Sequence, residues 1–324
     1  MNEGKMIRLN LGSGCNMNCP YCYEKNRINS FKIIEDTVLD TVIDYCKKNT
    51  DEDITIIFFG GEPTLYPDKI EYILNNLKSN KNVKYSIFTN GTNNDYIKYI
   101  INVYKIELGI IMSNKNSLPI SQYGDIKITQ YNIIMSPYTL DYIDEKYLKS
   151  LREYKNLMRG LFVFDLTADW ENYPEDKFIK IINKINTFCL ISKGKFTIEY
   201  FSEYDNERSN YINCTEPCLN VDTNGDVVFC HRYFNIPIRP KGCVLGNIVK
   251  DGVQTMWDKV WTVAHTTCEG GTCYFYMNLK PNWKNLFKLI LKTNLNMYAI
   301  QSFPSNNEQG FTTRIVARCG GCSG

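Results

Sequence analysis

The sequence has few histidines, little excess charge and no long apolar stretch. His231 and His265 are its two histidines, and 37 Lys and Arg residues nearly balance 35 Asp and Glu residues. A nucleic-acid binder usually shows a concentrated basic surface, and this chain has no obvious one. The longest apolar run, around residues 56–59, is far shorter than the ~20 residues that span a bilayer. These features argue against a nucleic-acid partner and against a membrane protein.

The first residues, MNEGKMIRLN, lack the apolar region of a signal peptide. We therefore expect a cytoplasmic protein whose thiols are kept reduced. The 324 residues, 44% of them hydrophobic, are enough for one large domain and a smaller second one.

Cysteine, by contrast, is abundant, and its 13 residues are unevenly placed. Three lie between Cys15 and Cys22, and eight lie between Cys214 and Cys322. Clustered cysteines in a reducing compartment favour metal ligands over disulfides. Cys46 and Cys189 stand alone among apolar residues of helix-like segments, which favours a place in the core.

Strand-like and helix-like segments alternate through the first 200 residues, which predicts an α/β fold with a parallel sheet. The expected strands are 7–11, 54–59, 83–89, 106–112, 126–135 and 161–166. The expected helices are 34–48, 67–79, 93–102, 138–155 and 174–190. Six such units over about 195 residues suggest a partial (β/α)6 barrel, because a complete eight-unit barrel normally needs ~250 residues. Sites in such folds lie at the C-terminal ends of the strands.

The stretch CNMNCPYCY at 15–23 follows the first expected strand, and it places three cysteines as C-x3-C-x2-C. A structural zinc ion would require a fourth nitrogen or sulfur ligand, and no histidine lies nearby in the sequence. Three thiolates on a four-iron cluster leave one iron open to a small molecule. The spacing of Cys15, Cys19 and Cys22 therefore favours an iron-sulfur cluster with an open iron.

This motif resembles that of the radical S-adenosylmethionine (SAM) superfamily, in which an aromatic residue, here Tyr21, precedes the last cysteine. The resemblance implies that a reduced [4Fe-4S] cluster cleaves SAM to a 5′-deoxyadenosyl radical, which then abstracts a hydrogen atom. It implies cytoplasmic redox partners as well, such as a flavodoxin or ferredoxin that donates the electron.

Three further strand ends extend the resemblance. FFGGEPTLYP at 58–67 matches the superfamily's turn that holds the amino group of SAM, with Gly60, Gly61, Glu62 and Pro63 in the matching places. FTNGT adds Thr89 and Asn90 as weaker SAM contacts, and Ser113 after the fourth strand is expected near the ribose. An ordinary turn remains an alternative at 88–92. Relatives carry Asp-Gly shortly after this serine and this chain does not, so no general acid or base is assigned.

The C-terminal third resembles the SPASM extension of radical SAM enzymes, which binds two auxiliary iron-sulfur clusters. The resemblance rests on C-x3-C-x11-C, the hairpin-like VDTNGDVVFC, LGNI at 245–248 and Trp257. Its eight cysteines divide into two sets of four: Cys214, Cys218, Cys230, Cys243, Cys268, Cys273, Cys319 and Cys322. We expect residues 1–200 to form the partial barrel and 201–324 a small α+β iron-sulfur domain.

Two segments of this extension can each be interpreted in two ways. The helical pattern of 282–298, within an insertion at about 274–318, favours a packing helix over a peptide-binding lid. RCGGCSG at 318–324 favours cluster ligands over a mobile redox pair.

Enzymes with this extension typically modify peptides and proteins. The sequence therefore predicts maturation of a ribosomally made peptide through a crosslink, a thioether or an epimerisation. Sulfatase-maturase-like formylglycine formation is the alternative enzyme, and a non-catalytic iron-sulfur carrier or binding protein is the alternative of another class. Few residues precede Cys15, so a separate leader-binding protein is among the expected partners.

Overall fold

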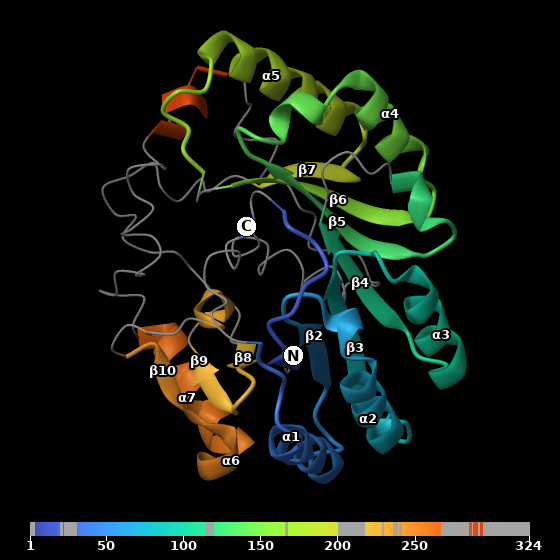
Figure 1. Ribbon diagram of the computed structural model, residues 1–324, viewed down its shortest axis with the longest axis vertical. Coiled ribbons are helices and arrows are strands. Elements are labelled where there is room, and N and C mark those ends of the chain that lie inside the picture. Colours follow the sequence, from blue (N-terminus) through green and yellow to red (C-terminus); the bar gives the residue numbers. More distant parts are fainter. Residues whose placement is uncertain are drawn as a thin grey trace. The chain divides into compact units, whose positions relative to one another are not determined.

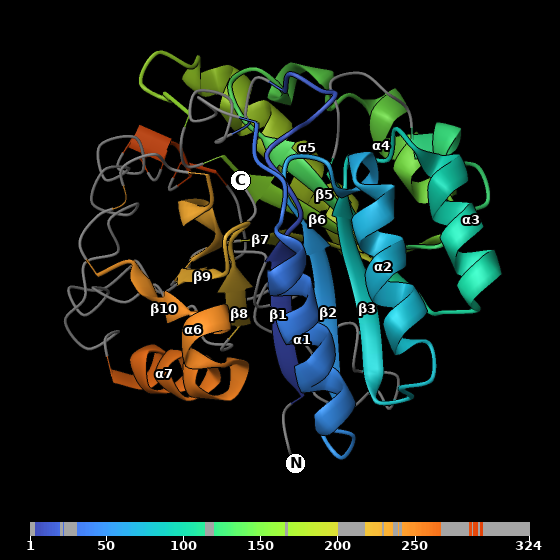
Figure 2. The same cartoon turned by 60° about the horizontal axis from the view of Figure 1, so that its bottom comes forward.

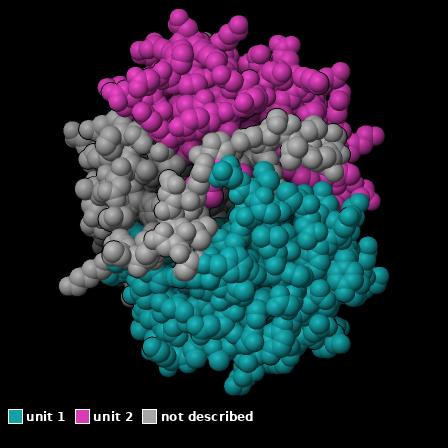
Figure 3. Space-filling view, in the orientation of Figure 1, with its two compact units in different colours: residues 1–18, 24–111, 214–267 teal, residues 19–23, 112–213, 268–324 magenta. Residues whose placement is uncertain are grey.

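The computed structural model describes most of the chain up to residue 266 and short stretches beyond it. The described residues are 4–19, 22, 31–113, 120–165, 168–199, 218–228, 230–235, 239, 242–266, 285–286, 288–290 and 292–293. They fall into two compact units, which Figure 3 colours teal and magenta. Unit 1 comprises residues 1–18, 24–111 and 214–267, and unit 2 comprises residues 19–23, 112–213 and 268–324.

Unit 1 is built on a sheet with the strand order β10-β9-β8-β1-β2-β3-β4 (Figure 1). The strands are β1 (Lys5–Asn10), β2 (Ile54–Phe59), β3 (Val83–Thr89), β4 (Leu108–Ser113), β8 (Cys218–Val221), β9 (Asp226–Val228) and β10 (Val244–Asn247). β1 pairs in parallel with both β2 and β8, whereas β9 runs antiparallel to β8 and β10. The cysteine-rich extension thus adds strands to the sheet that begins with β1.

Helices cover this sheet, and Figure 2 shows α1 and α2 lying over β1 to β3. The helices of unit 1 are α1 (Asp36–Lys48), α2 (Pro67–Leu77), α3 (Asn94–Tyr104), α6 (Ile248–Asp251) and α7 (Val253–Thr266). α1 buries Val38, Leu39, Val42 and Ile43, whose spacing of three and four places them on one face. β2 is buried along its whole length, as expected of a parallel strand with both faces covered.

Unit 2 contains the parallel strands β5 (Ile128–Met135), β6 (Leu157–Phe164) and β7 (Phe196–Glu199), in that order. The helices α4 (Glu145–Glu153) and α5 (Glu175–Ile191) connect these strands. α5 contributes Phe178, Ile182 and Phe188 to the core, and Phe188 packs against Phe196 of β7. Residues 285–286 and 288–290, within the predicted helix of the insertion, have helical backbone, and Leu286 and Ile290 are buried.

None of the described helices is long and apolar enough to cross a membrane. The predicted domain boundary near residue 200 stays a prediction.

Candidate SAM and iron-sulfur site

The turn after β2 lies against the segment after β1, backbone to backbone. Gly61 N donates a hydrogen bond to Gly12 O at 2.9 Å, and Glu62 N donates one to Gly14 O at 2.8 Å. A Cβ atom on Gly60 would lie 2.5 Å from Gly12 O, and one on Gly61 would lie 2.4 Å from Gly14 O. Gly60 also has a φ of +146°, which residues with side chains rarely adopt. Glycines at 60 and 61 are therefore required for the turn to approach the segment that leads to Cys15.

Tyr66 supports the same segment from the other side of the turn. Its hydroxyl accepts a hydrogen bond from Gly14 N at 2.6 Å, and its ring tilts against that of Phe31. Tyr66 is buried at the N-terminal end of α2. Sequence reasoning missed Tyr66, although it lies only four residues after Glu62.

Glu62 connects the turn to the end of β3. Its side chain is fully buried, and Oε1 accepts hydrogen bonds from Thr64 N, Thr64 Oγ1 and Thr89 Oγ1 at 3.1, 2.7 and 2.8 Å. Oε2 accepts one from Asn90 N at 2.6 Å. A carboxylate has about four acceptor positions, so the chain itself supplies a nearly full set of donors. The geometry makes Glu62 a positioning residue for residues 89–90, and its predicted contact with the amino group of SAM stays a prediction.

Asn90 reaches from the end of β3 to the first cysteine. Its Nδ2 lies 2.7 Å from Asn16 Oδ1 and 3.7 Å from Cys15 Sγ, while its Oδ1 accepts a bond from Thr92 Oγ1. Asn16 in turn donates to Thr92 Oγ1 at 2.9 Å. The strand ends thus bring Cys15, Glu62, Thr89 and Asn90 together, as the sequence predicted from their places after neighbouring strands. Asn16 and Thr92 were missed, because polar residues beside a motif have no spacing rule of their own.

Cys19 and Cys22 contact each other through their backbones. Cys22 N donates to Cys19 O at 3.1 Å, and Cys19 packs against Ile134, Leu161 and Val163. Cys15 and Cys22 are exposed, and Cys19 is partly exposed. Within the residues that the structure describes, no three His, Cys, Asp or Glu side chains are gathered as they would be around a metal ion. The assignment of these cysteines as cluster ligands stays a prediction.

The remaining predicted SAM contacts are less defined. Pro63 is buried at the start of a 3₁₀ turn (Pro63–Leu65), and Ser113 is the half-buried last residue of β4. Tyr21 lies outside the described residues.

Three of the eight predicted auxiliary ligands are described, and all three are buried. Cys218 begins β8 beside Met6 of β1, Cys230 precedes a 3₁₀ turn (His231–Tyr233), and Cys243 directly precedes β10. Burial raises the pKa of the Cys243 thiol, and the charge of Arg239 offsets part of this rise. Cys214, Cys268, Cys273, Cys319 and Cys322 lie outside the described residues.

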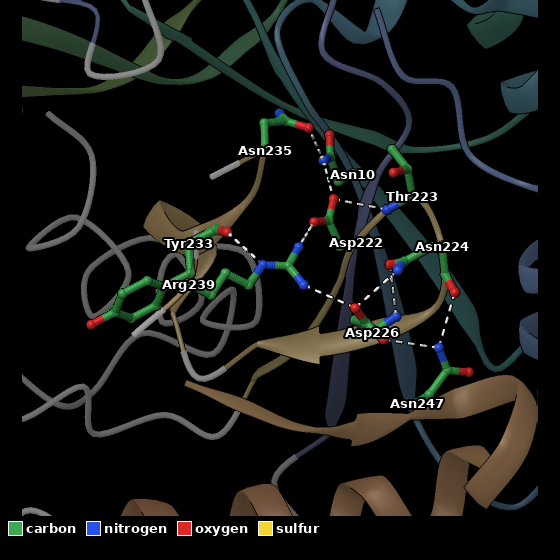
Figure 4. Close-up of polar contacts among 9 residues, drawn as sticks. All are labelled: Asn10, Asp222, Thr223, Asn224, Asp226, Tyr233, Asn235, Arg239 and Asn247. Atoms are coloured by element: carbon green, nitrogen blue, oxygen red, sulfur yellow. Dashed lines mark hydrogen bonds and ion pairs between the residues drawn. The ribbon is translucent and has the colours of Figure 1, made fainter. Parts of the chain in front are cut away.

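A polar network joins the cysteine-bearing loop to the end of β1 (Figure 4). Asp222 accepts a hydrogen bond from Asn10 Nδ2 at 2.6 Å and pairs with Arg239. Arg239 also donates to Asp226 Oδ2 at 2.9 Å and to Tyr233 O at 3.3 Å. Asp222 is 1% exposed, so this ion pair is well shielded from water. The network holds Tyr233 and Arg239, which come between Cys230 and Cys243 in the sequence, beside the strand that leads to Cys15.

His231 lies in the core of unit 1. Arg8 Nη1 is 2.9 Å from His231 Nδ1, and the imidazole meets the ring of Phe59 edge-on. A guanidinium can only donate, so this contact assigns the ring proton to Nε2. The side chain of His265 lies outside the described residues.

Cys46 is buried in α1, as predicted, whereas Cys189 in α5 is only partly buried. Burial raises the pKa of each thiol to about 12. Both therefore remain protonated at neutral pH and are poor metal ligands and nucleophiles.

Comparisons with known proteins agree with this geometry. The sequence model of the radical SAM superfamily matches residues 9–185, more than half of the chain. An uncharacterized protein of Methanocaldococcus jannaschii is 29% identical over 248 residues, covering 70% of this chain and 84% of that protein. A cysteine-type anaerobic sulfatase-maturating enzyme of Clostridium novyi is 34% identical over 111 residues, which cover 31% of this chain and 30% of the enzyme. The radical SAM cyclopropyl synthase TigE of Paramaledivibacter caminithermalis is 33% identical over 104 residues, covering 27% of this chain and 22% of the synthase.

Solved structures show the same fold. Native anSMEcpe with bound AdoMet and Cp18Cys peptide aligns with a TM-score of 0.58 at 16% identity, covering 89% of this chain and 97% of that chain. A histidine-tagged form of anSMEcpe with bound AdoMet gives 0.57 at 18% identity, covering 89% and 98%. The fold class predicted from the sequence, α/β with parallel strands in a partial barrel of this type, is confirmed.

Proposed function

We propose that this chain, which belongs to the radical SAM superfamily, is an enzyme that modifies a ribosomally made peptide by abstracting hydrogen from one of its C–H bonds. The observation that carries the proposal is the junction of three strand ends. Gly60 and Gly61 lie against the segment before Cys15, and Asn90 approaches the thiol of Cys15. This junction lies at the C-terminal edge of the parallel strands, where sites of α/β folds are found.

The residues present fit a [4Fe-4S] cluster that leaves one iron open. Cys15, Cys19 and Cys22 lie within eight residues of each other in the sequence, and soft thiolates are the usual ligands of iron-sulfur clusters. Cys15 and Cys22 are exposed and Cys19 is partly exposed. With SAM bound, such a cluster supplies a radical that removes hydrogen from an unactivated carbon.

The chain's own residues would position the cofactors. The backbone contacts of Gly60 and Gly61 fix the turn against residues 12–14, and Glu62 fixes the end of β3 through Thr89 and Asn90. Asn90 donates toward the thiol of Cys15, which would stabilise its thiolate form. Ser113 remains the proposed contact for the ribose.

The peptide substrate is supported by the kind of relatives that the chain resembles. One solved structure of the same fold holds a peptide, and it aligns with 89% of this chain. We propose further that the eight cysteines from Cys214 to Cys322 hold two auxiliary [4Fe-4S] clusters, and that a flavodoxin or ferredoxin supplies electrons. A separate leader-binding protein is part of this proposal as the means of substrate selection.

Formylglycine formation on a sulfatase cysteine or serine is the second candidate. It is favoured by the 34% identity to the sulfatase-maturating enzyme of Clostridium novyi, which is confined to 111 residues.

The test is SAM cleavage by the anaerobically reconstituted protein with dithionite as reductant. Formation of 5′-deoxyadenosine is expected, and it should be lost in the triple variant Cys15→Ala, Cys19→Ala, Cys22→Ala while most auxiliary iron is retained. Cleavage by the triple variant would disprove the cluster assignment. A synthetic sulfatase-type cysteine peptide then separates the two candidates, since conversion of its thiol to an aldehyde would establish the second.

A further inference from the structure

Two carboxamide side chains are buried side by side on β5 with unused hydrogen-bonding atoms. Gln130 is 1% exposed and Asn132 is 0% exposed. Gln130 Nε2 donates to Asn132 Oδ1 at 2.5 Å, which leaves Gln130 Oε1 and Asn132 Nδ2 without a hydrogen-bond partner. Buried polar groups are nearly always paired, so two orphans on adjacent side chains call for an explanation.

The pair presents one acceptor beside one donor, whichever way its amides are oriented. If both amides were flipped, Asn132 would donate to Gln130, and the free atoms would be a nitrogen on Gln130 and an oxygen on Asn132. In either orientation one N–H group and one C=O group remain. This arrangement is complementary to another amide, which offers one N–H and one C=O in return.

The pair shares its sheet face with one of the predicted cluster ligands. Residues two apart on a strand point to the same face, so Gln130, Asn132 and Ile134 form one row. In register on β6 lie Arg159, Leu161 and Val163, opposite these three residues respectively. Cys19 packs against Ile134, Leu161 and Val163. The two carboxamides therefore lie on the same row of β5 as Ile134, which contacts Cys19. Asn132 is two residues and Gln130 four residues from Ile134, or roughly 7–14 Å along the strand.

The neighbours on this row are apolar where they contact Cys19, whereas the buried and charged Arg159 lies opposite Gln130. Leucine at 130 and 132 would remove two unpaired polar groups at similar volume. A buried polar group that lowers the stability of the fold, and that lies on the same sheet face as a predicted cluster ligand, is typical of a functional site.

We propose that Gln130 and Asn132 bind an amide of the peptide substrate, one accepting from its N–H and the other donating to its C=O. This assignment rests on the proposed function, because it requires a peptide that enters the site at Cys19. It identifies the substrate as a peptide that presents an amide, from its backbone or from an Asn or Gln side chain, close to the reacting carbon.

The experiment compares the full-length reconstituted enzyme with the double variant Gln130→Leu, Asn132→Leu. The probe is an equimolar library of synthetic 12-residue peptides, and the readout is 5′-deoxyadenosine formed above the rate without peptide. The best wild-type substrate is then resynthesised with each backbone amide replaced in turn by an ester. Tyr131→Phe is the matched control, since it changes a fully buried side chain on the opposite face of the same strand.

In the double variant we expect the KM for the selected peptide to rise about tenfold or more. SAM binding and peptide-independent SAM cleavage should stay within twofold of wild type, and the melting temperature should be equal or higher. One ester position should weaken the wild type several-fold and leave the double variant unaffected.

Three outcomes would overturn the assignment. An unchanged KM with a lower melting temperature would show a purely structural pair. Weaker SAM binding would place the pair in the cofactor site. If no peptide stimulates the wild type, the peptide function itself is refuted. This outcome differs from failure of the Gln130 and Asn132 assignment, because it is seen in the wild type alone.

Discussion

At the residue scale, Glu62 determines how the turn after β2 meets the end of β3. Its carboxylate accepts four hydrogen bonds from Thr64, Thr89 and Asn90. In Glu62→Gln an NH₂ group must face at least one of these donors, so at least one hydrogen bond becomes a donor–donor contact. The residue thus couples two segments that are predicted to bind SAM, whatever it contacts directly.

We predict that Glu62→Gln weakens SAM binding by about tenfold or more while the visible spectrum of the cluster is retained. A hydrogen bond to a charged group is worth about 1.5–3 kcal/mol, and the substitution displaces Thr89 and Asn90 together. Equilibrium dialysis with labelled SAM measures the change. Asp68→Asn, an exposed carboxylate in the first turn of α2, is the control and should bind SAM normally. Equal affinity in Glu62→Gln and wild type would contradict this role.

Cys46 and Cys189 give a second prediction, which concerns pH. A thiol reacts as its thiolate, and burial raises the pKa of both groups to about 12. At pH 8 the thiolate fraction is on the order of one in ten thousand, and it rises tenfold for each pH unit up to the pKa. In metal-free native protein, iodoacetamide should therefore label the exposed Cys15 and Cys22 first, as read by peptide mass spectrometry. Early labelling of Cys46 would show that its helix opens readily.

At the element scale, most strands and helices begin and end within a few residues of the predicted positions. β2 and β3 match their predicted limits, because runs rich in β-branched and aromatic residues end directly before Gly60 and Asn90. β6 begins at Leu157, four residues before the prediction, since Arg159 and Gly160 break the apolar pattern. β7 was not predicted, because its four residues pair with β6 through contacts that no local pattern records.

The residues of the candidate site likewise divide into those that a sequence motif predicts and those that it does not. Cys15 and the turn at 60–63 could be predicted to lie near each other because each belongs to a motif of fixed spacing that follows a strand, while their roles stay predictions. Asn16, Tyr66 and Thr92 could not, since their roles arise from distances that exist only after folding. The pairing of β8 with β1 was also hidden, because it joins residues more than 200 positions apart.

The N-terminus of α4 offers a prediction about one element alone. Asp144 Oδ1 accepts a hydrogen bond from Tyr147 N at 2.7 Å, which satisfies a backbone donor at the helix start. Asp144→Ala should lower the free energy of unfolding by about 1 kcal/mol. Urea unfolding in the presence and absence of the change measures it. Lys149→Ala, on the exposed face of the same helix, is the control, and an equal loss in both variants would show that the cap is not responsible.

The ion pair connects Asp222, which follows β8, to Arg239, which precedes β10 in the sequence. Asp222→Asn removes the charge opposite a largely buried guanidinium, and breaking such a pair typically costs about 3–5 kcal/mol. Because Arg239 comes between the proposed ligands Cys230 and Cys243 in the sequence, we expect a lower melting temperature together with loss of auxiliary iron. Asp251→Asn, whose carboxylate accepts from Asn247 N on the exposed side of β10, is the matched control. Full iron content in Asp222→Asn would show that the network does not support a cluster.

At the scale of the whole molecule, the extension and the barrel strands are not separate in the sheet of unit 1. β8 carries Cys218 directly beside β1, and β1 leads to Cys15. Metal binding by the cysteines of the extension would therefore stabilise the same sheet that presents the SAM site, because metal binding contributes free energy to folding wherever its ligands are fixed.

The last prediction concerns Cys319 and Cys322, which lie outside the described residues. If they are ligands, residues 274–318 form a loop that is anchored to metal at both ends, and removing the pair should release an auxiliary cluster. A chain that ends at Arg318 should then retain SAM cleavage but hold about eight irons instead of about twelve, assuming four-iron clusters. Iron and sulfide analysis of the truncated and full-length proteins measures this, and the double variant Cys319→Ser, Cys322→Ser separates the loss of thiols from the loss of chain. Equal iron in all three proteins would exclude a ligand role and favour a mobile redox pair, whose reduced thiols should then react with iodoacetamide in the fully reconstituted enzyme.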